Sequence, residues 1–382
     1  MKRIILLIET SREFGRQLII GIARYARLHG PWTFYKEPVD LKSSIPKLTN
    51  WKPDGIIMRD SLITKELLKL RIPTILAIHD SKYPGNLPVI KTDSRSIAKM
   101  ASEHLLGKGF RNFAFCGFDD YDWSNGRKLY FCKFIEEAGY NVHVYQQPEG
   151  KIRISWEKEQ KYVSEWVKFL PKPIGVFACN DDRGQHILEA CKMLNLKVPE
   201  DVAVIGVDND PLVCELGDPP LSSIALNVES AGYEAAKLLD QLINKRKTTG
   251  KKIMVYPSRV VQRQSTDILA VSDPEVAKAI GYIKNNAKNK ILVKDVVNAT
   301  NVSRRTLEKR FKECIHRTIH EEIKKVRIEL ISKMLIETDM PISQITSLFS
   351  FTDNEHISRF FKKEKGICLR EFRRLCKLPN NL

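Results

Sequence analysis

Residues 303–312 of this chain read SRRTLEKRFK. This stretch predicts a helix that buries Leu307 and Phe311, which lie four residues apart, and presents a basic face outward. Ser303 is placed to cap the helix, because its hydroxyl can accept a hydrogen bond from a backbone amide of the first turn. A shorter amphipathic stretch over residues 292–297 precedes it. Two short helices joined by a tight turn, the second of them basic, predict a helix-turn-helix unit.

The same pattern recurs further along the chain, where residues 353–363 read DNEHISRFFKK. Ile345 lies 49 residues after Val296, and Phe361 lies 50 residues after Phe311. The second copy has one additional turn residue. This internal repetition predicts a second helix-turn-helix unit.

One long helix is predicted between the two copies, over His320–Thr338, from its apolar positions. A helix of about 18 residues is about 27 Å long, because each residue adds about 1.5 Å. Successive major grooves on one face of DNA lie about 34 Å apart. The pattern therefore predicts two units held far enough apart for their second helices to enter successive major grooves.

The distribution of charge also indicates a polyanionic partner. The 382 residues carry a net charge of +17. Residues 271–382 contain 23 Lys and Arg and 14 Asp and Glu, a net charge of +9, whereas the chain from 1 to 270 has a net charge of +8. The last third of the chain is thus more than twice as positive per residue, which suits binding to double-stranded DNA.

The sequence from position 1 to position 225 alternates apolar strands with amphipathic helices. The predicted helices include Arg16–Leu28, Ser94–Leu106, Gln185–Leu194 and, further on, Ala231–Ile243, and a last extended segment is predicted over Ile253–Val261. Such alternation predicts parallel sheets covered by helices. The expected strands are Ile4–Ile8, Gly55–Met58, Thr74–Ile78, Asn112–Cys116, Ile174–Ala178 and Val202–Val207.

The character of the chain changes near residue 265. Residues 264–273 are polar, and Asp273-Pro274 is typical of a helix start. From there on the sequence predicts only helices and short turns. The expected domain boundary therefore lies at about residues 264–274.

The C-terminal part resembles the AraC/XylS family of regulators, whose DNA-binding domain has two helix-turn-helix units joined by a long helix. The resemblance covers residues 273–377 and rests on residues 303–311, 351–363, Gly366 and residues 371–373. The chain departs from the family in three turns. Ser350 replaces a usual Gly, Cys368-Leu369 replaces a usual Thr-Pro, and a usual Gly is replaced near His316.

The resemblance implies which side chains meet DNA. In the first unit Arg305, Glu308 and Lys309 would face base edges, and in the second unit Asn354, Glu355, Ser358 and Arg359 would do so. Arg and Lys suit guanine, Asn suits adenine, and Glu can accept from cytosine. Phosphate contacts are implied for Arg304, Arg310, Lys312, Lys362 and Lys363.

The N-terminal part is similar to the sensors of LacI/GalR-type repressors, which have a two-lobed periplasmic-binding-protein fold. The motifs are Asn180-Asp181, residues 198–208 (VPEDVAVIGVD) and residues 229–236 (ESAGYEAA). The resemblance implies an α/β two-lobed sensor with parallel sheets over residues 1–265. An all-α domain with two helix-turn-helix motifs, residues 273–377, would follow it.

This similarity implies a ligand between the lobes, because open parallel sheets bind ligands at the carboxyl ends of their strands. Asp, Asn and Arg can pair with sugar hydroxyls, and Trp can cover an apolar sugar face. For Asp208 a turn cap, and for Trp123 a core position, are alternative interpretations. The expected ligand-binding residues are Ser11, Arg12, Arg16, Trp123, Arg127, Asn180, Asp181 and Asp208.

Other classes of protein have little support in the sequence. It lacks phosphate-loop, nucleophile-elbow and zinc-ribbon spacings, so no enzyme activity, cofactor or metal site is expected. Without a membrane span or targeting segment, the cytoplasm is the expected compartment. The eight cysteines are interpreted as small core residues.

The resulting hypothesis is a transcription regulator that acts as an activator and as a homodimer. Its expected partners are a DNA operator, RNA polymerase and a sugar effector, either xylose or a related compound. The alternative is a sugar-binding protein without a regulatory role.

Overall fold

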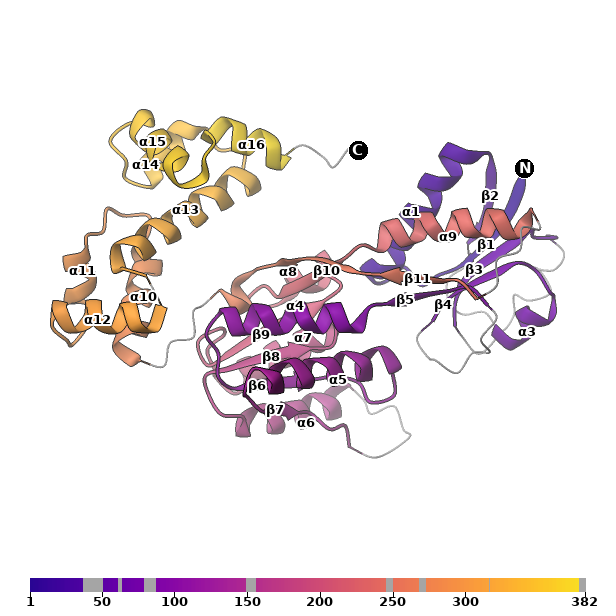
Figure 1. Ribbon diagram of the computed structural model, residues 1–382, viewed down its shortest axis with the longest axis horizontal. Coiled ribbons are helices and arrows are strands. Elements are labelled where there is room, and N and C mark those ends of the chain that lie inside the picture. The colour runs from indigo at the N-terminus through magenta and orange to yellow at the C-terminus, as the bar shows by residue number, and fades with distance from the viewer. Residues whose placement is uncertain are drawn as a thin grey trace. The chain divides into compact units, whose positions relative to one another are not determined.

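The computed structural model describes residues 1–36, 51–60, 64–78, 87–148, 156–244, 250–267, 273–315 and 317–377. The chain divides into two compact units, Met1–Ile268 and Leu269–Leu382. The first unit contains two lobes, each built on one six-stranded sheet, and the second unit is helical (Figure 1). Among the residues described, no helix is long and apolar enough to cross a membrane.

The first lobe contains a fully parallel sheet with the strand order β11-β5-β4-β3-β1-β2. Helices α1 (Glu13–His29) and α9 (Val228–Ile243) cover one face and pack on each other. A Cβ at Gly21 would lie 1.9 Å from the Glu229 carbonyl oxygen, and one at Gly232 would lie 2.2 Å from that of Leu18. Only glycine permits this close packing of two helices from distant parts of the sequence. Helix α3 is Thr64–Lys69, and the strands are β1 (Lys2–Leu7), β2 (Trp32–Lys36), β3 (Gly55–Arg59), β4 (Thr74–Ala77), β5 (Val89–Thr92) and β11 (Lys252–Val255).

The second lobe contains a sheet with the order β12-β10-β9-β8-β6-β7, parallel except where β12 joins β10. Strands β8 and β9 are entirely buried. The strands are β6 (Phe113–Cys116), β7 (Val142–Val144), β8 (Ile174–Ala178), β9 (Val202–Val207), β10 (Ser222–Leu226) and β12 (Pro257–Val261). The helices are α4 (Ser94–Gly107), α5 (Asp122–Glu137), α6 (Trp156–Phe169), α7 (Asp181–Met193) and α8 (Pro211–Leu216), and a 3-10 turn, η1, spans Gln264–Thr266.

The chain passes between the lobes three times, from β5 to α4, from β10 to α9 and from β11 to β12. The last passage corrects one prediction. The single extended segment expected over Ile253–Val261 is two strands in different sheets, separated at Tyr256. The alternation of side chains along a strand does not show which partner strand each half will pair with, so the break was not visible in the sequence.

The second unit confirms the predicted pair of helix-turn-helix units. Leu307 and Phe311 are buried in the first apolar cluster, and Ile357 and Phe361 in the second. Asp273 caps α10 by accepting from the backbone amides of residues 275 and 276. The helices are α10 (Pro274–Asn286), α11 (Val293–Asn298), α12 (Arg304–Ile315), α13 (Ile319–Glu337), α14 (Ile342–Leu348), α15 (Asn354–Lys365) and α16 (Leu369–Lys377).

The structure confirms some of the other predictions on strands, helices and cysteines and corrects the rest. The predicted strands and helices occur within a few residues of their expected bounds, but β2, β5, β7 and β10 were not predicted. Cys116, Cys179, Cys191 and Cys214 are buried, as expected. Cys314 and Cys368 are exposed, so the core interpretation is wrong for these two. His316, at one of the departing turns, lies outside the described residues.

Candidate functional site

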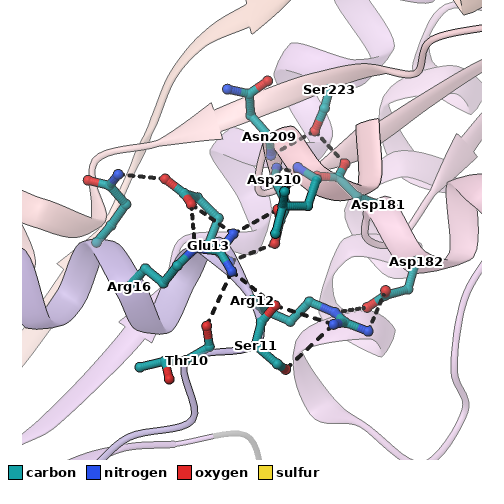
Figure 2. Close-up of polar contacts among 12 residues, drawn as sticks. Thr10, Ser11, Arg12, Glu13, Arg16, Asp181, Asp182, Asn209, Asp210 and Ser223 are labelled. Carbon is teal, nitrogen blue, oxygen red and sulfur yellow. Dashed lines mark hydrogen bonds and ion pairs between the residues drawn. The ribbon is translucent and has the colours of Figure 1, made fainter. Parts of the chain in front are cut away.

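The carboxyl ends of strands from both sheets meet through polar contacts between the lobes (Figure 2). Asp210 follows β9 in the second lobe and is only 1% exposed. Its carboxylate accepts from Arg16 Nη2 at 2.7 Å and from the Glu13 backbone amide at 2.8 Å, both on α1 of the first lobe. The anion thus lies at the positive N-terminal end of α1, which stabilises it. Arg16 also donates to the carbonyl oxygens of Thr10 and Ser11.

A second ion pair joins the lobes beside the first. Arg12 contacts the Asp182 carboxylate with two nitrogens, Nε and Nη2, each at 2.9 Å. Asp182 lies in the first turn of α7, and Asn180 caps that helix by accepting from the Arg183 amide at 3.0 Å. Arg12 and Arg16 therefore hold the lobes together in this conformation. Ser11 bonds to Glu9 within its own loop.

Asp181 forms its hydrogen bonds within the second lobe and supports the loop that follows β9. Its carboxylate accepts from the Ser223 hydroxyl and, at 2.8 Å, from the Asp210 backbone amide, and the residue is 3% exposed. Burial is the main cause that raises the pKa of Asp181 well above its usual range. Because both oxygens are engaged inside the second lobe, Asp181 positions the loop after β9 that carries Asp208 and Asp210.

Asp208 and Arg127 form the charged centre of the candidate site. Arg127 is 2% exposed and donates to the carbonyl oxygen of Cys179, while its Nε has no hydrogen-bond partner within the described chain. Asp208 is half-buried and has a φ of 103°, in the region that favours glycine. It interacts electrostatically with Arg127 and also with Arg59, at the end of β3 in the first lobe.

Burial and neighbouring charges shift the titration of these groups. The pKa of Asp208 is raised to about 6, mainly by burial and also by the carboxylates of Asp182 and Asp210, while Arg127 and Arg59 oppose the shift. Burial lowers the pKa of Arg127 and of Arg59, although nearby carboxylates oppose this. An unusual backbone conformation and a perturbed carboxylate in one residue are typical of functional sites.

Aromatic side chains lie next to these charges. The Arg127 guanidinium carbon is 4.9 Å from the centre of the Trp123 ring. Tyr121 stacks on Trp123 with 5.7 Å between ring centres, and Phe118 meets Trp123 edge-on at 6.3 Å. A carboxylate, guanidinium groups and an aromatic face are the combination with which proteins bind small polar ligands.

The structure thus separates the predicted ligand-binding residues into two groups. Trp123 contacts Arg127, and Arg127 interacts electrostatically with Asp208, whereas Ser11, Arg12, Arg16, Asn180 and Asp181 form hydrogen bonds or ion pairs elsewhere in the sensor unit. Arg59, Asp182 and Asp210 were not predicted. Arg59 ends a buried strand, so the strand-end argument that selected Asp208 applies to it as well.

The proposed DNA-facing residues lie on α12 and α15. All are exposed except Ser358, which is half-buried. Arg304 pairs with Glu308 at 2.9 Å, and Arg310 pairs with Asp273 at 3.2 Å. The Asn354 side chain accepts from Thr346 Oγ1 at 2.6 Å, which ties α15 to α14. Asp353 caps α15 at its start, and Gly366, with φ of 78°, ends the helix.

Comparisons with known proteins agree with this architecture. Residues 102–266 match the model of the periplasmic binding protein-like domain, and residues 296–375 match a helix-turn-helix domain. The chain is similar to the xylose operon regulatory proteins of Escherichia coli K12 (34% identity, 97% of this chain, 96% of the relative) and Haemophilus influenzae (33%, 98% of each). It is also similar to the solved structure of a xylose-binding transcription activator, with a TM-score of 0.73, 32% identity and 98% of each chain covered.

Proposed function

Because this chain belongs to the family of the xylose operon regulatory proteins, we propose that its effector is xylose or a closely related sugar. The chain is a DNA-binding transcription regulator, as the sequence predicts. The alternative of a sugar-binding protein without a regulatory role is set aside, because a helix-turn-helix domain follows the sensor. The relatives are regulators rather than enzymes, and we propose no catalytic role for the chain.

The observation that carries the sugar proposal is the arrangement of Asp208, Arg127 and Trp123. The carboxylate can accept from two neighbouring hydroxyls, and the Arg127 Nε, which has no hydrogen-bond partner within the described chain, can donate to a third. The Trp123 ring, with Tyr121 stacked on it, would supply the apolar side of the site for the C–H groups of a sugar. Arg59 would contribute from the opposite lobe, so that a bound sugar touches both lobes.

We propose that the sugar acts by favouring one arrangement of the lobes. A ligand shifts such an equilibrium only by its difference in affinity for the two states. Contacts from Asp208 and Arg127 on one lobe and Arg59 on the other exist together only when the lobes are close. The pairs Arg16–Asp210 and Arg12–Asp182 would favour the same closed state.

The helical unit, Leu269–Leu382, would then transmit the response to the sugar to DNA. Base contacts are proposed for Arg305, Glu308 and Lys309 on α12, and for Asn354, Glu355, Ser358 and Arg359 on α15. Arg304 and Lys362 would contact phosphates. The proposed mode of action is activation by a homodimer that contacts RNA polymerase in the cytoplasm.

The first experiment tests the effector by thermal unfolding in the presence of D-xylose, D-ribose, L-arabinose, D-glucose and sugar acids. Trp166 is the last tryptophan along the chain, so tryptophan fluorescence reports on the sensor unit alone. A sugar at a hundredfold excess over its Kd stabilises the folded state by about 2.7 kcal/mol. We expect the unfolding midpoint to rise with D-xylose or a related pentose.

Two variants sharpen the experiment. Arg127→Met removes the proposed donor, and Lys133→Met removes an exposed cation of the same helix that forms a surface pair with Glu137. We expect the midpoint shift to vanish in the first variant and to persist in the second. An equal shift in both would contradict the proposed site, and no shift with any sugar in the unmodified protein would contradict the proposed effector.

A further inference from the structure

One arginine in the middle of helix α13, Arg327, has its guanidinium group buried between the two halves of the helical unit. Arg327 is 8% exposed. Its Nη1 donates to the carbonyl oxygen of Ala287 at 2.9 Å and also to that of Asn289, and its Nη2 donates to the carbonyl oxygen of Phe349 at 2.7 Å. The guanidinium is thus bound by backbone oxygens on two sides.

These acceptors lie beside the first helix-turn-helix unit on one side and within the second on the other. Ala287 caps the C-terminal end of α10, and Asn289 lies between α10 and α11, just before the first helix-turn-helix unit. Phe349 caps the C-terminal end of α14 in the second helix-turn-helix unit, where the turn leads into α15. Because the two ends of the guanidinium fork meet separate parts of the domain, one side chain connects the turn that leads into α11 with the turn that leads into α15.

The position of Arg327 along α13 matches this connection. Val326, immediately before it, packs in the apolar cluster around the first helix-turn-helix unit. Ile328, immediately after it, packs in the cluster around the second helix-turn-helix unit. Arg327 therefore lies where the two cores separate. Without the contacts of Arg327, helix α13 alone would determine the rotation of one core relative to the other.

The chemistry of the contact is specific to arginine. The guanidinium carbon lies 4.8 Å from the centre of the Phe351 ring, so the planar group also packs on an aromatic face. Burial lowers the pKa of Arg327, yet arginine stays charged in proteins. A lysine ammonium is a compact point charge without a planar fork, so it cannot reproduce this geometry. Arg373, in contrast, donates to Leu335 and Met340 and stays within the second half of the domain.

We propose that Arg327 is a positioning residue that fixes the rotation and separation of the two helix-turn-helix units. It thereby sets the spacing of two DNA half-sites, meaning the two short sequences that the two units of one chain contact. This proposal rests on the function in which both units read DNA. One base pair changes the separation of half-sites by about 3.4 Å and their rotation by about 34°. Two units held rigidly therefore bind half-sites at one spacing, whereas two units that can move relative to each other bind half-sites at several spacings.

The test is selection from a pool of random-sequence duplex DNA by the full-length protein, with and without D-xylose, followed by sequencing of the bound fraction. The unmodified protein, Arg327→Lys and Arg327→Met are compared. Lys325→Met is the matched control, because it removes a neighbouring cation of α13 that pairs with Glu329 of the same helix. Affinities are then measured for the enriched duplexes and for versions with one base pair inserted between the half-sites.

We expect the unmodified protein and Lys325→Met to enrich, for each protomer, two half-sites at one dominant spacing, and to lose at least tenfold in affinity when one base pair is inserted between those two half-sites. Both Arg327 variants should enrich the same half-sites at several spacings, with less than a threefold penalty for the insertion.

Two results would overturn the positioning role. One is an unchanged dominant spacing in both Arg327 variants. The other is loss of one half-site sequence altogether, since Arg327 would then be needed to fold that unit. If the unmodified protein enriches no sequence, the DNA-reading function itself fails and this proposal fails with it.

Discussion

Replacing Asp208 with asparagine should stabilise the sensor while it removes the response to sugar. Burial raises the pKa of this carboxyl group from 3.8 to about 6 in the folded protein, even though Arg127 and Arg59 attract its charge. The charged form is thus less favourable in the folded than in the unfolded state. Asparagine keeps the size of the side chain and tolerates the positive φ, but it carries no charge.

The magnitude follows from linkage between protonation and folding. A raised carboxyl pKa destabilises the folded state only where the group must ionise, so the penalty is absent below about pH 4 and complete above about pH 6. At about 1.4 kcal/mol per pKa unit, the penalty is at most about 3 kcal/mol at pH 7.5 and about half of that at pH 5. The half-buried position makes these values upper limits. Asp208→Asn should therefore raise the free energy of unfolding by about 1–3 kcal/mol at neutral pH, and by less in acid.

Urea unfolding followed by tryptophan fluorescence measures this difference at pH 7.5 and pH 5, and calorimetric titration with D-xylose measures binding. The comparison of two variants at each pH cancels the titration of other groups. Glu234→Gln is the control, because this exposed carboxylate forms a surface pair with Lys237 at 3.7 Å; its effect should stay within about 0.5 kcal/mol. A destabilised Asp208→Asn protein, or a gain that grows toward acid pH, would refute the reasoning. Full retention of sugar binding would remove Asp208 from the site.

Three other changes test separate parts of the structure. Arg16→Met should weaken D-xylose binding about 5- to 30-fold. Asp210 is buried while Arg16 is partly exposed, so the stabilisation from this pair should lie between that of surface and of buried ion pairs. An unchanged Kd in calorimetry would contradict the role of Arg16 between the lobes. Ser350→Gly should stabilise the second helix-turn-helix unit by about 1 kcal/mol, since residue 350 has a φ of 52°, and faster amide exchange in α14 and α15 would argue against this. Arg305→Ala combined with Arg359→Ala should abolish sequence-selective DNA binding at unchanged helicity, and retained preference of this double variant for selected over random duplexes would remove these residues from a reading role.

The sequence predicted the architecture well where local periodicity decides it. Leu307 and Phe311, and their repeats at Ile357 and Phe361, are buried as their four-residue spacing requires. Buried strands such as Val202–Val207 were recognisable as uninterrupted apolar runs, whereas the short strand β7 was missed. The left-handed conformation of Ser350 agrees with the glycine that the AraC/XylS resemblance implies at that turn.

Only the tertiary structure decided what the polar side chains do. Asp181 and Asp208 both follow buried strands, yet one bonds within its own lobe and the other interacts with Arg127 and with Arg59 from the facing lobe. Their sequence positions do not distinguish them, because their partners in the folded protein come from distant parts of the chain.

The same limit applied to Arg327, whose acceptors lie 40 residues before it and 22 residues after it. The apolar faces of the helices and the fully buried strands depend on neighbours within a few residues, so the sequence by itself determined them, whereas short strands such as β7 did not have such a pattern. The partner of a buried charge depends on which distant turns the fold brings together, and tertiary structure alone supplied that.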